Sequence, residues 1–132
     1  MPKVTVTIDV EVDPDWIEFC TSEYVDVFMS GYCGYWMGGV EHDPKLGWLV
    51  HLSDDGKNAR QASQDPKYKS ILKAWKAGED LPEGWHRLNE ELATKAWTEG
   101  VKKYGTDWFE NADAYTYDYV IQTALFGETV YG

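Results

Sequence analysis

Ten consecutive residues near the start of the chain alternate strictly between β-branched apolar and polar side chains. The run K-V-T-V-T-I-D-V-E-V covers residues 3–12. Successive side chains of a strand point to opposite faces, so this pattern gives one apolar face and one polar face. We therefore predict a half-buried strand over residues 4–12. The segment Asp13-Pro14-Asp15 is predicted to end it, because proline has no N–H to donate to a sheet.

The rest of the chain shows mainly helical periodicity. Apolar side chains recur at spacings of three and four residues, which places them on one face of a helix. The predicted helices cover residues 23–37, 68–77, 88–104 and 113–126. A second, mostly buried strand is predicted at residues 46–52, as the nearest partner of the first, and the polar residues 57–66 are expected to form a surface loop. This order predicts an α+β fold with a small two- or three-stranded sheet packed against about four helices.

The length of 132 residues fits a single compact α+β domain covering residues 1–132. No run of 18 apolar residues is present, so we expect no membrane-spanning segment. The first residues lack the continuous apolar stretch of a signal peptide. We therefore expect a cytoplasmic protein whose two cysteines, Cys20 and Cys33, are reduced and packed.

The net charge of −11 is unevenly distributed along the chain. Residues 1–56 carry 11 acids and two bases, residues 57–103 carry ten bases and seven acids, and residues 104–132 carry five acids and no base. The net charges of these three segments are therefore −9, +3 and −5. A basic middle segment can supply a local anion-binding patch in an acidic protein, although solvated helix faces with i,i+4 ion pairs explain the same pattern.

Two segments resemble a family of small proteins encoded by phages and prophages. The segment E-Y-V-D-V-F-M-S-G-Y-C-G-Y-W-M resembles an acidic helix that ends in G-x-x-Y-W, with Gly34, Tyr35 and Trp36 at its end. The segment D-Y-V-I-Q-T-A-L-F-G-E-T-V-Y-G, residues 118–132, resembles the C-terminal pattern D-x-I-x-Q-x-A-L-F-G-x-x-V-x-G. The family has no assigned function, so the resemblance implies a viral setting and supplies no active site.

Catalytic motifs are missing from the sequence. It contains no phosphate-binding glycine loop, no nucleophile–base spacing and no metal-ligand set, and its three histidines, His42, His51 and His86, are scattered. We therefore expect a protein that is not an enzyme and uses no cofactor.

Aromatic residues are unusually frequent, with seven tryptophans and nine tyrosines. Such rings combine apolar area with a polar group and are enriched at binding surfaces, whereas packing in a helical stripe is the competing interpretation of Tyr35 and Trp36. The segment Trp85-His86-Arg87 follows a Pro-x-Gly turn and joins two rings to a guanidinium. The predicted ligand-binding residues are Tyr35, Trp36 and Trp85 for a base and Arg60, Lys67, Lys69 and Arg87 for phosphate.

These observations predict a phage-encoded binding protein that counteracts host antiviral defence by sequestering a nucleotide immune signal. An alternative prediction is an acidic inhibitor that imitates nucleic acid and binds a host defence protein or nuclease through complementary charge. We expect no direct nucleic-acid binding. A homo-oligomer is also expected, since an exposed aromatic stripe favours self-association.

Overall fold

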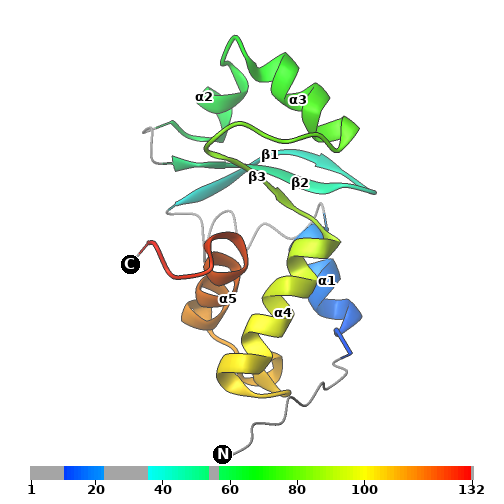
Figure 1. The fold of residues 1–132 in the computed structure, drawn as a ribbon, viewed down its shortest axis with the longest axis vertical. Coiled ribbons are helices and arrows are strands. Elements are labelled where there is room, and N and C mark those ends of the chain that lie inside the picture. The colour runs from blue at the N-terminus through cyan, green and yellow to red at the C-terminus, as the bar shows by residue number, and fades with distance from the viewer. Residues whose placement is uncertain (1–10, 23–35, 54–56, 132) are drawn as a thin grey trace, which may run out of the picture.

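The middle strand of the sheet pairs with both of the other strands. In the computed structural model, which describes residues 11–22, 36–53 and 57–131, this strand is β2 (Gly47–Leu52). β1 (Met37–Asp43) pairs with it on one edge and β3 (Trp85–Leu88) on the other, and both pairings are antiparallel. The result is a three-stranded sheet in the order β1-β2-β3 (Figure 1).

Side chains of β2 alternate between two hydrophobic clusters. Leu49 packs with Ile71 and Trp75 on one side, while Val50 and Leu52 belong to the cluster on the other side. The first side is covered by α2 (Ala59–Ser63) and α3 (Tyr68–Ala77). The second side is covered by α1 (Pro14–Thr21), α4 (Glu90–Tyr104) and α5 (Ala114–Phe126), together with the 3-10 helix η3 (Trp108–Asn111) (Figure 1). The predicted α+β class is confirmed.

Side-chain caps explain where three of these helices begin. Asp13 accepts a hydrogen bond from the backbone N–H of Asp15 at 2.9 Å, and Pro14 follows it in the first turn of α1. Asn89 caps α4 through the N–H of Leu92 at 2.9 Å, and Asp113 begins α5. Asp13-Pro14-Asp15 was predicted to end a strand, and in the structure it begins α1, because proline at the first helical position is preorganised for a helix.

The structure confirms four predicted elements of the chain. The predicted strand 46–52 corresponds to β2, and the predicted helices 68–77, 88–104 and 113–126 correspond to α3, α4 and α5. Gly78 closes α3 in the left-handed conformation, with φ of 72°, which glycine adopts without steric cost.

Other predictions differ from the structure or fall outside its described residues. Most of the predicted strand 4–12 and helix 23–37 lies outside them. The few described residues of these two segments differ from the prediction. Glu11 and Val12 belong to no strand, and Met37 begins β1 instead of ending a helix. The predicted loop 57–66 contains the short helix α2, and the tripeptide Trp85-His86-Arg87 lies on β3 instead of in a loop.

Most of the tryptophans build the core. Six of the seven are buried, and only Trp48 is half-buried. Trp16 is fully enclosed, and its indole N–H donates to the backbone carbonyl of Ala93 at 2.8 Å. Its ring meets that of Trp108 edge to face at a centroid distance of 5.0 Å. The aromatic surplus in the sequence is therefore used mainly to fill the interior beneath the sheet.

Candidate functional site

A cleft of about 970 Å³ lies at the β3 edge of the molecule. Its walls come from the ends of β2 and β3, the loop before β3 and the C-terminal end of α5. We call it the β3 cleft, and its lining residues are His51, Leu52, Asp80, Leu81, Pro82, Glu83, Gly84, Trp85, His86, Arg87, Leu125, Phe126 and Tyr131. This volume lies at the upper end of the range typical of small-molecule sites.

A glycine turn forms the first wall of the β3 cleft. Gly84 has a φ of +88°, which a residue with a side chain rarely adopts. Its carbonyl accepts a hydrogen bond from the N–H of Leu52 at 2.8 Å, and the N–H of Trp85 donates to the carbonyl of Pro82 at 3.2 Å. These bonds fix the start of β3 and the loop that leads into it.

Gln122 holds the opposite wall in place. This side chain of α5 is buried, and its carbonyl oxygen accepts from the N–H groups of Val130 at 2.7 Å and Tyr131 at 2.8 Å. Its amide group donates to the carbonyl of Tyr131 at 2.9 Å and to Asp118 at 2.9 Å. The segment after α5 is therefore held against the helix, with Tyr131 at the cleft.

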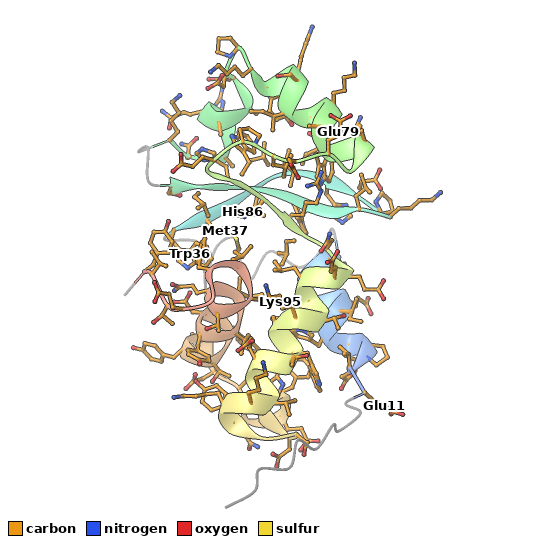
Figure 2. The ribbon with its side chains drawn as sticks, in the orientation of Figure 1. Glu11, Trp36, Met37, Glu79, His86 and Lys95 are labelled. Carbon is orange, nitrogen blue, oxygen red and sulfur yellow. The ribbon has the colours of Figure 1, made fainter. Side chains whose placement is uncertain are left out.

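Aromatic rings line the inside of the β3 cleft from both walls. His86 meets Phe126 edge to face at a centroid distance of 5.7 Å, and His51 lies 4.8 Å from Trp85. Figure 2 shows His86 between the sheet and α5. Trp85 is only 8% exposed, so it contributes an edge to the cleft. The half-buried rings of His86, Phe126 and Tyr131 are the surfaces available for stacking.

The charged groups of the β3 cleft are few. Asp80 and Glu83 contribute two carboxylates, and among the described residues Arg87 is the only lysine or arginine that lines it. Burial lowers the pKa of His86 below its ordinary value, so this imidazole is neutral at physiological pH. A neutral imidazole donates a hydrogen bond through one ring nitrogen and accepts through the other.

Arg87 has a structural role at the end of α3. One guanidinium nitrogen, Nη2, donates to the backbone carbonyls of Ala74 at 3.1 Å, Trp75 at 3.4 Å and Glu79 at 2.6 Å. The carbonyls of Ala74 and Trp75 also accept from the backbone N–H groups of Glu79 and Gly78, so the guanidinium adds a charged donor at the end of α3 and links Glu79 to it. Arg87 can therefore offer a ligand only the guanidinium N–H groups that are not bonded to these carbonyls.

The aromatic residues predicted to bind a base are not gathered at one place. Tyr35 lies outside the described residues. Trp36 is 1% exposed, stacks on Tyr131 at a centroid distance of 5.0 Å and donates its N–H to Asp118 at 2.8 Å, so its ring is a core residue beside the cleft (Figure 2). Of the two predicted rings that the structure describes, Trp85 lines the β3 cleft and Trp36 does not.

The predicted phosphate ligands also lie apart from the β3 cleft. Arg60 is on α2, Lys67 immediately precedes α3 and Lys69 is in its first turn, all exposed on the layer that covers the other face of the sheet. None of them lines the cleft, whereas Arg87 does. The structure therefore brings together Trp85 and Arg87 from the predicted set, and separates them from Arg60, Lys67 and Lys69.

Sequence reasoning missed the cleft rings of His51, Phe126 and Tyr131, and also the rim carboxylates of Asp80 and Glu83. A signal for two of them was present, since Phe126 and Tyr131 belong to the C-terminal segment that carries the phage resemblance. His51 gave no comparable signal, because it lies next to Trp85 only through the pairing of β2 with β3.

A smaller groove of about 360 Å³ lies at the far end of the helical layer. Trp97 and Phe109 contribute aromatic rings, and none of the described residues that line it is basic. We call it the acidic groove, and its carboxylates are those of Glu11, Asp13, Asp107 and Glu110. Such a groove suits a cationic side chain of a protein partner.

The described part of the chain shows neither a metal site nor a membrane-spanning helix. Within residues 11–22, 36–53 and 57–131, no group of three or more histidine, cysteine or carboxylate side chains is arranged to hold a metal ion. No helix in the same part of the chain has the length and hydrophobicity needed to cross a membrane.

Comparison with known proteins gives no assignment. A scan against protein-family models finds no match, and searches of curated proteins and of solved structures find no significant match. The resemblance to phage proteins therefore stays a prediction based on the two segments described above.

Proposed function

We propose that this protein is a non-catalytic binding protein that captures a nucleobase-bearing ligand in the β3 cleft. The observation that carries the proposal is the composition of the cleft, where the half-buried rings of His86, Phe126 and Tyr131 face a polar rim. Stacking of a base on an aromatic ring contributes about 1–3 kcal/mol per base. In the viral setting implied by the resemblance, such capture would remove a host immune signal from circulation.

The charges of the cleft restrict the ligand further. Asp80 and Glu83 can accept hydrogen bonds from the amino and ring N–H groups of a base, as carboxylates do from cytosine. The same carboxylates repel phosphate, and Arg87 is already engaged at α3. The cleft therefore fits a ligand with one phosphodiester, such as a cyclic mononucleotide, better than a triphosphate.

Binding without turnover is part of the proposal. Hydrolysis of a nucleotide needs an activated water or a nucleophile with a base in hydrogen-bond reach. The cleft offers a neutral His86 whose ring packs against Phe126, together with two rim carboxylates. This set favours recognition of a base over attack on a phosphate.

Extracts of phage-infected, defence-active cells provide the test. The purified protein is incubated with the extract, washed and denatured, and the released small molecules are identified by mass spectrometry. We expect an intact nucleotide from the wild type and none from Phe126→Ala, with Arg60→Ala as a matched control outside the cleft. Release of no nucleotide from the wild type, or equal release from Phe126→Ala, would reject the proposal.

The acidic groove supports a second candidate, inhibition of a basic host protein. Residues 11–22 and 88–131, which form the helical layer, carry twelve acids and three bases, a net charge of −9. A partner held by this charge would be retained at low salt and released at high salt. Glu110→Lys would abolish its capture while leaving nucleotide release unchanged, which separates the two candidates.

A further inference from the structure

The outer face of α3 is a lysine-rich surface that the β3 cleft does not use. It forms a shallow groove of about 480 Å³, which we call the lysine face, lined by Lys69, Leu72, Lys73, Lys76 and Ala77. The three lysines are exposed, and Leu72 is half-buried between them. None of them belongs to an ion pair within the described residues.

Lys67, Lys69 and Lys73 are unfavourably placed on α3, whereas Lys76 lies in its last turn, where a cation is favourable. Lys67 and Lys69 lie at the N-terminal end of α3, where the helix dipole is positive, and this helix has neither an acid in its first turn nor a side-chain cap. Lys69 and Lys73 are like charges at i,i+4, an unfavourable spacing. An anionic partner would offset both effects, so the arrangement points to an intermolecular contact.

Charge is separated along the long axis of the molecule. Residues 57–77, which include α2 and α3, carry six bases and one acid, a net charge of +5. The helical layer across the sheet carries −9, and η3 with the start of α5 lies at the end remote from α3 (Figure 1). One molecule therefore presents a basic surface and an acidic surface at its two ends.

The remote end is chemically complementary to the lysine face. We call it the acidic end, and it consists of Glu11, Asp13, Asp107, Glu110, Asp113 and Tyr115. Tyr115 is 85% exposed, which suits cation–π contact with a lysine. The nearby bases are already engaged, since Lys102 pairs with Glu99 at 3.6 Å and Lys103 lies 5.6 Å from the centroid of the Tyr119 ring.

We propose that the lysine face docks on the acidic end of a second copy of this chain. The contact is head-to-tail, because the two surfaces differ and lie at opposite ends, so it builds rings or short filaments instead of a twofold dimer. A protein partner is favoured over nucleic acid, since none of the described residues that line the lysine face is an aromatic ring on which a base could stack. Within the described part of the chain, the lysine face and the β3 cleft share no lining residue, so the contact uses none of the residues that line the cleft.

Complementary charge reversals test this contact. Lys69→Glu with Lys73→Glu reverses the lysine face, and Asp107→Lys with Glu110→Lys reverses the acidic end; all four side chains are exposed and cap no helix. Sedimentation velocity at low salt should show concentration-dependent association of the wild type and at least about tenfold weaker association of each variant alone. An equimolar mixture of the two variants should associate again, because each reversed surface meets its complement.

Lys95→Glu on α4 is the matched control, since Lys95 is exposed and belongs to neither surface (Figure 2). It should associate like the wild type, and circular dichroism should be the same for all variants. A wild type that stays monomeric at low salt, or a mixture that fails to associate, would overturn the proposal. Binding of a labelled RNA oligonucleotide by monomeric wild type, lost on reversing the lysine face, would overturn it in favour of nucleic acid.

Discussion

The indole N–H of Trp36 donates a hydrogen bond to the carboxylate of Asp118 at 2.8 Å, across 82 residues of sequence. The same carboxylate accepts from Gln122 at 2.9 Å, and Gln122 in turn holds the backbone of Tyr131. Trp36 and the C-terminal segment therefore meet at one point, and their junction lies directly behind a wall of the β3 cleft.

Removing the Trp36–Asp118 hydrogen bond should destabilise the fold. Asp118→Ala leaves a buried indole N–H without its acceptor, which costs about 1–3 kcal/mol of unfolding free energy. Asp118→Asn retains one acceptor oxygen and should cost less. Urea denaturation followed by tryptophan fluorescence measures both. Equal stability of Asp118→Ala and the wild type would contradict the role given to this bond.

Arg87 should contribute to stability through α3. Its guanidinium donates charged hydrogen bonds to the carbonyls of Ala74, Trp75 and Glu79, so Arg87→Met should lower the unfolding free energy by about 1–2 kcal/mol. Arg60→Met, at an exposed position, should change it by less than about 0.5 kcal/mol. The same denaturation experiment compares the two. If Arg60→Met is the more damaging substitution, the capping role is wrong.

Gly100 should be intolerant of any side chain. A Cβ atom at this position would lie 2.4 Å from Cε2 of Trp108, whose ring is 2% exposed and cannot move aside easily. Overpacking of this kind costs about 1–3 kcal/mol, against a gain of about 1 kcal/mol in helix propensity. We expect Gly100→Ala to lower the melting temperature, while Thr94→Ala on the exposed face of α4 leaves it nearly unchanged. A rise in melting temperature for Gly100→Ala would show that Trp108 is not fixed there.

His86 should make stability depend on pH. Burial lowers its pKa in the folded state, so the unfolded chain binds the proton more readily. The contribution of neutral His86 is present above the unfolded pKa of about 6.5 and decreases as pH falls below that value. Measurements of unfolding free energy between pH 7.5 and about 5 should show this loss. His86→Phe should reduce the slope over that interval, and an unchanged slope would argue against the shift.

Helical periodicity allowed α3 and α4 to be predicted, because each buries one apolar stripe, and α5 was predicted although it buries five consecutive residues, 120–124. β3 could not be predicted, since four residues provide too little alternation and Trp85 with Arg87 suggested a binding loop. α1 was missed because Pro14 was interpreted only as a strand terminator, whereas Asp13 caps a helix there. The site was only partly predictable for a related reason. Trp85 and Arg87 gave a local signal, but the neighbourhood of His51, Phe126 and Tyr131 depends on tertiary packing.

The aromatic content was the most misleading feature. Tryptophan was interpreted as a surface residue for binding, yet the indole N–H groups of Trp16 and Trp36 find buried acceptors in the core. The partners are a helix carbonyl and a carboxylate far away in sequence, which no local pattern reveals. The basic middle segment was similarly divided by the fold, with Lys69 on the outer layer and Arg87 at the cleft.

Backbone NMR of the labelled protein tests the central claim most directly. Cyclic AMP and cyclic GMP are titrated separately into the 15N-labelled chain, with ATP as the more highly charged comparison. We predict chemical-shift changes confined to residues 51–52, 80–87 and 125–131, and binding of a cyclic mononucleotide about tenfold tighter than that of ATP. The absence of shifts in those segments, or shifts centred on Lys69, Lys73 and Lys76, would contradict capture of a nucleobase in the β3 cleft.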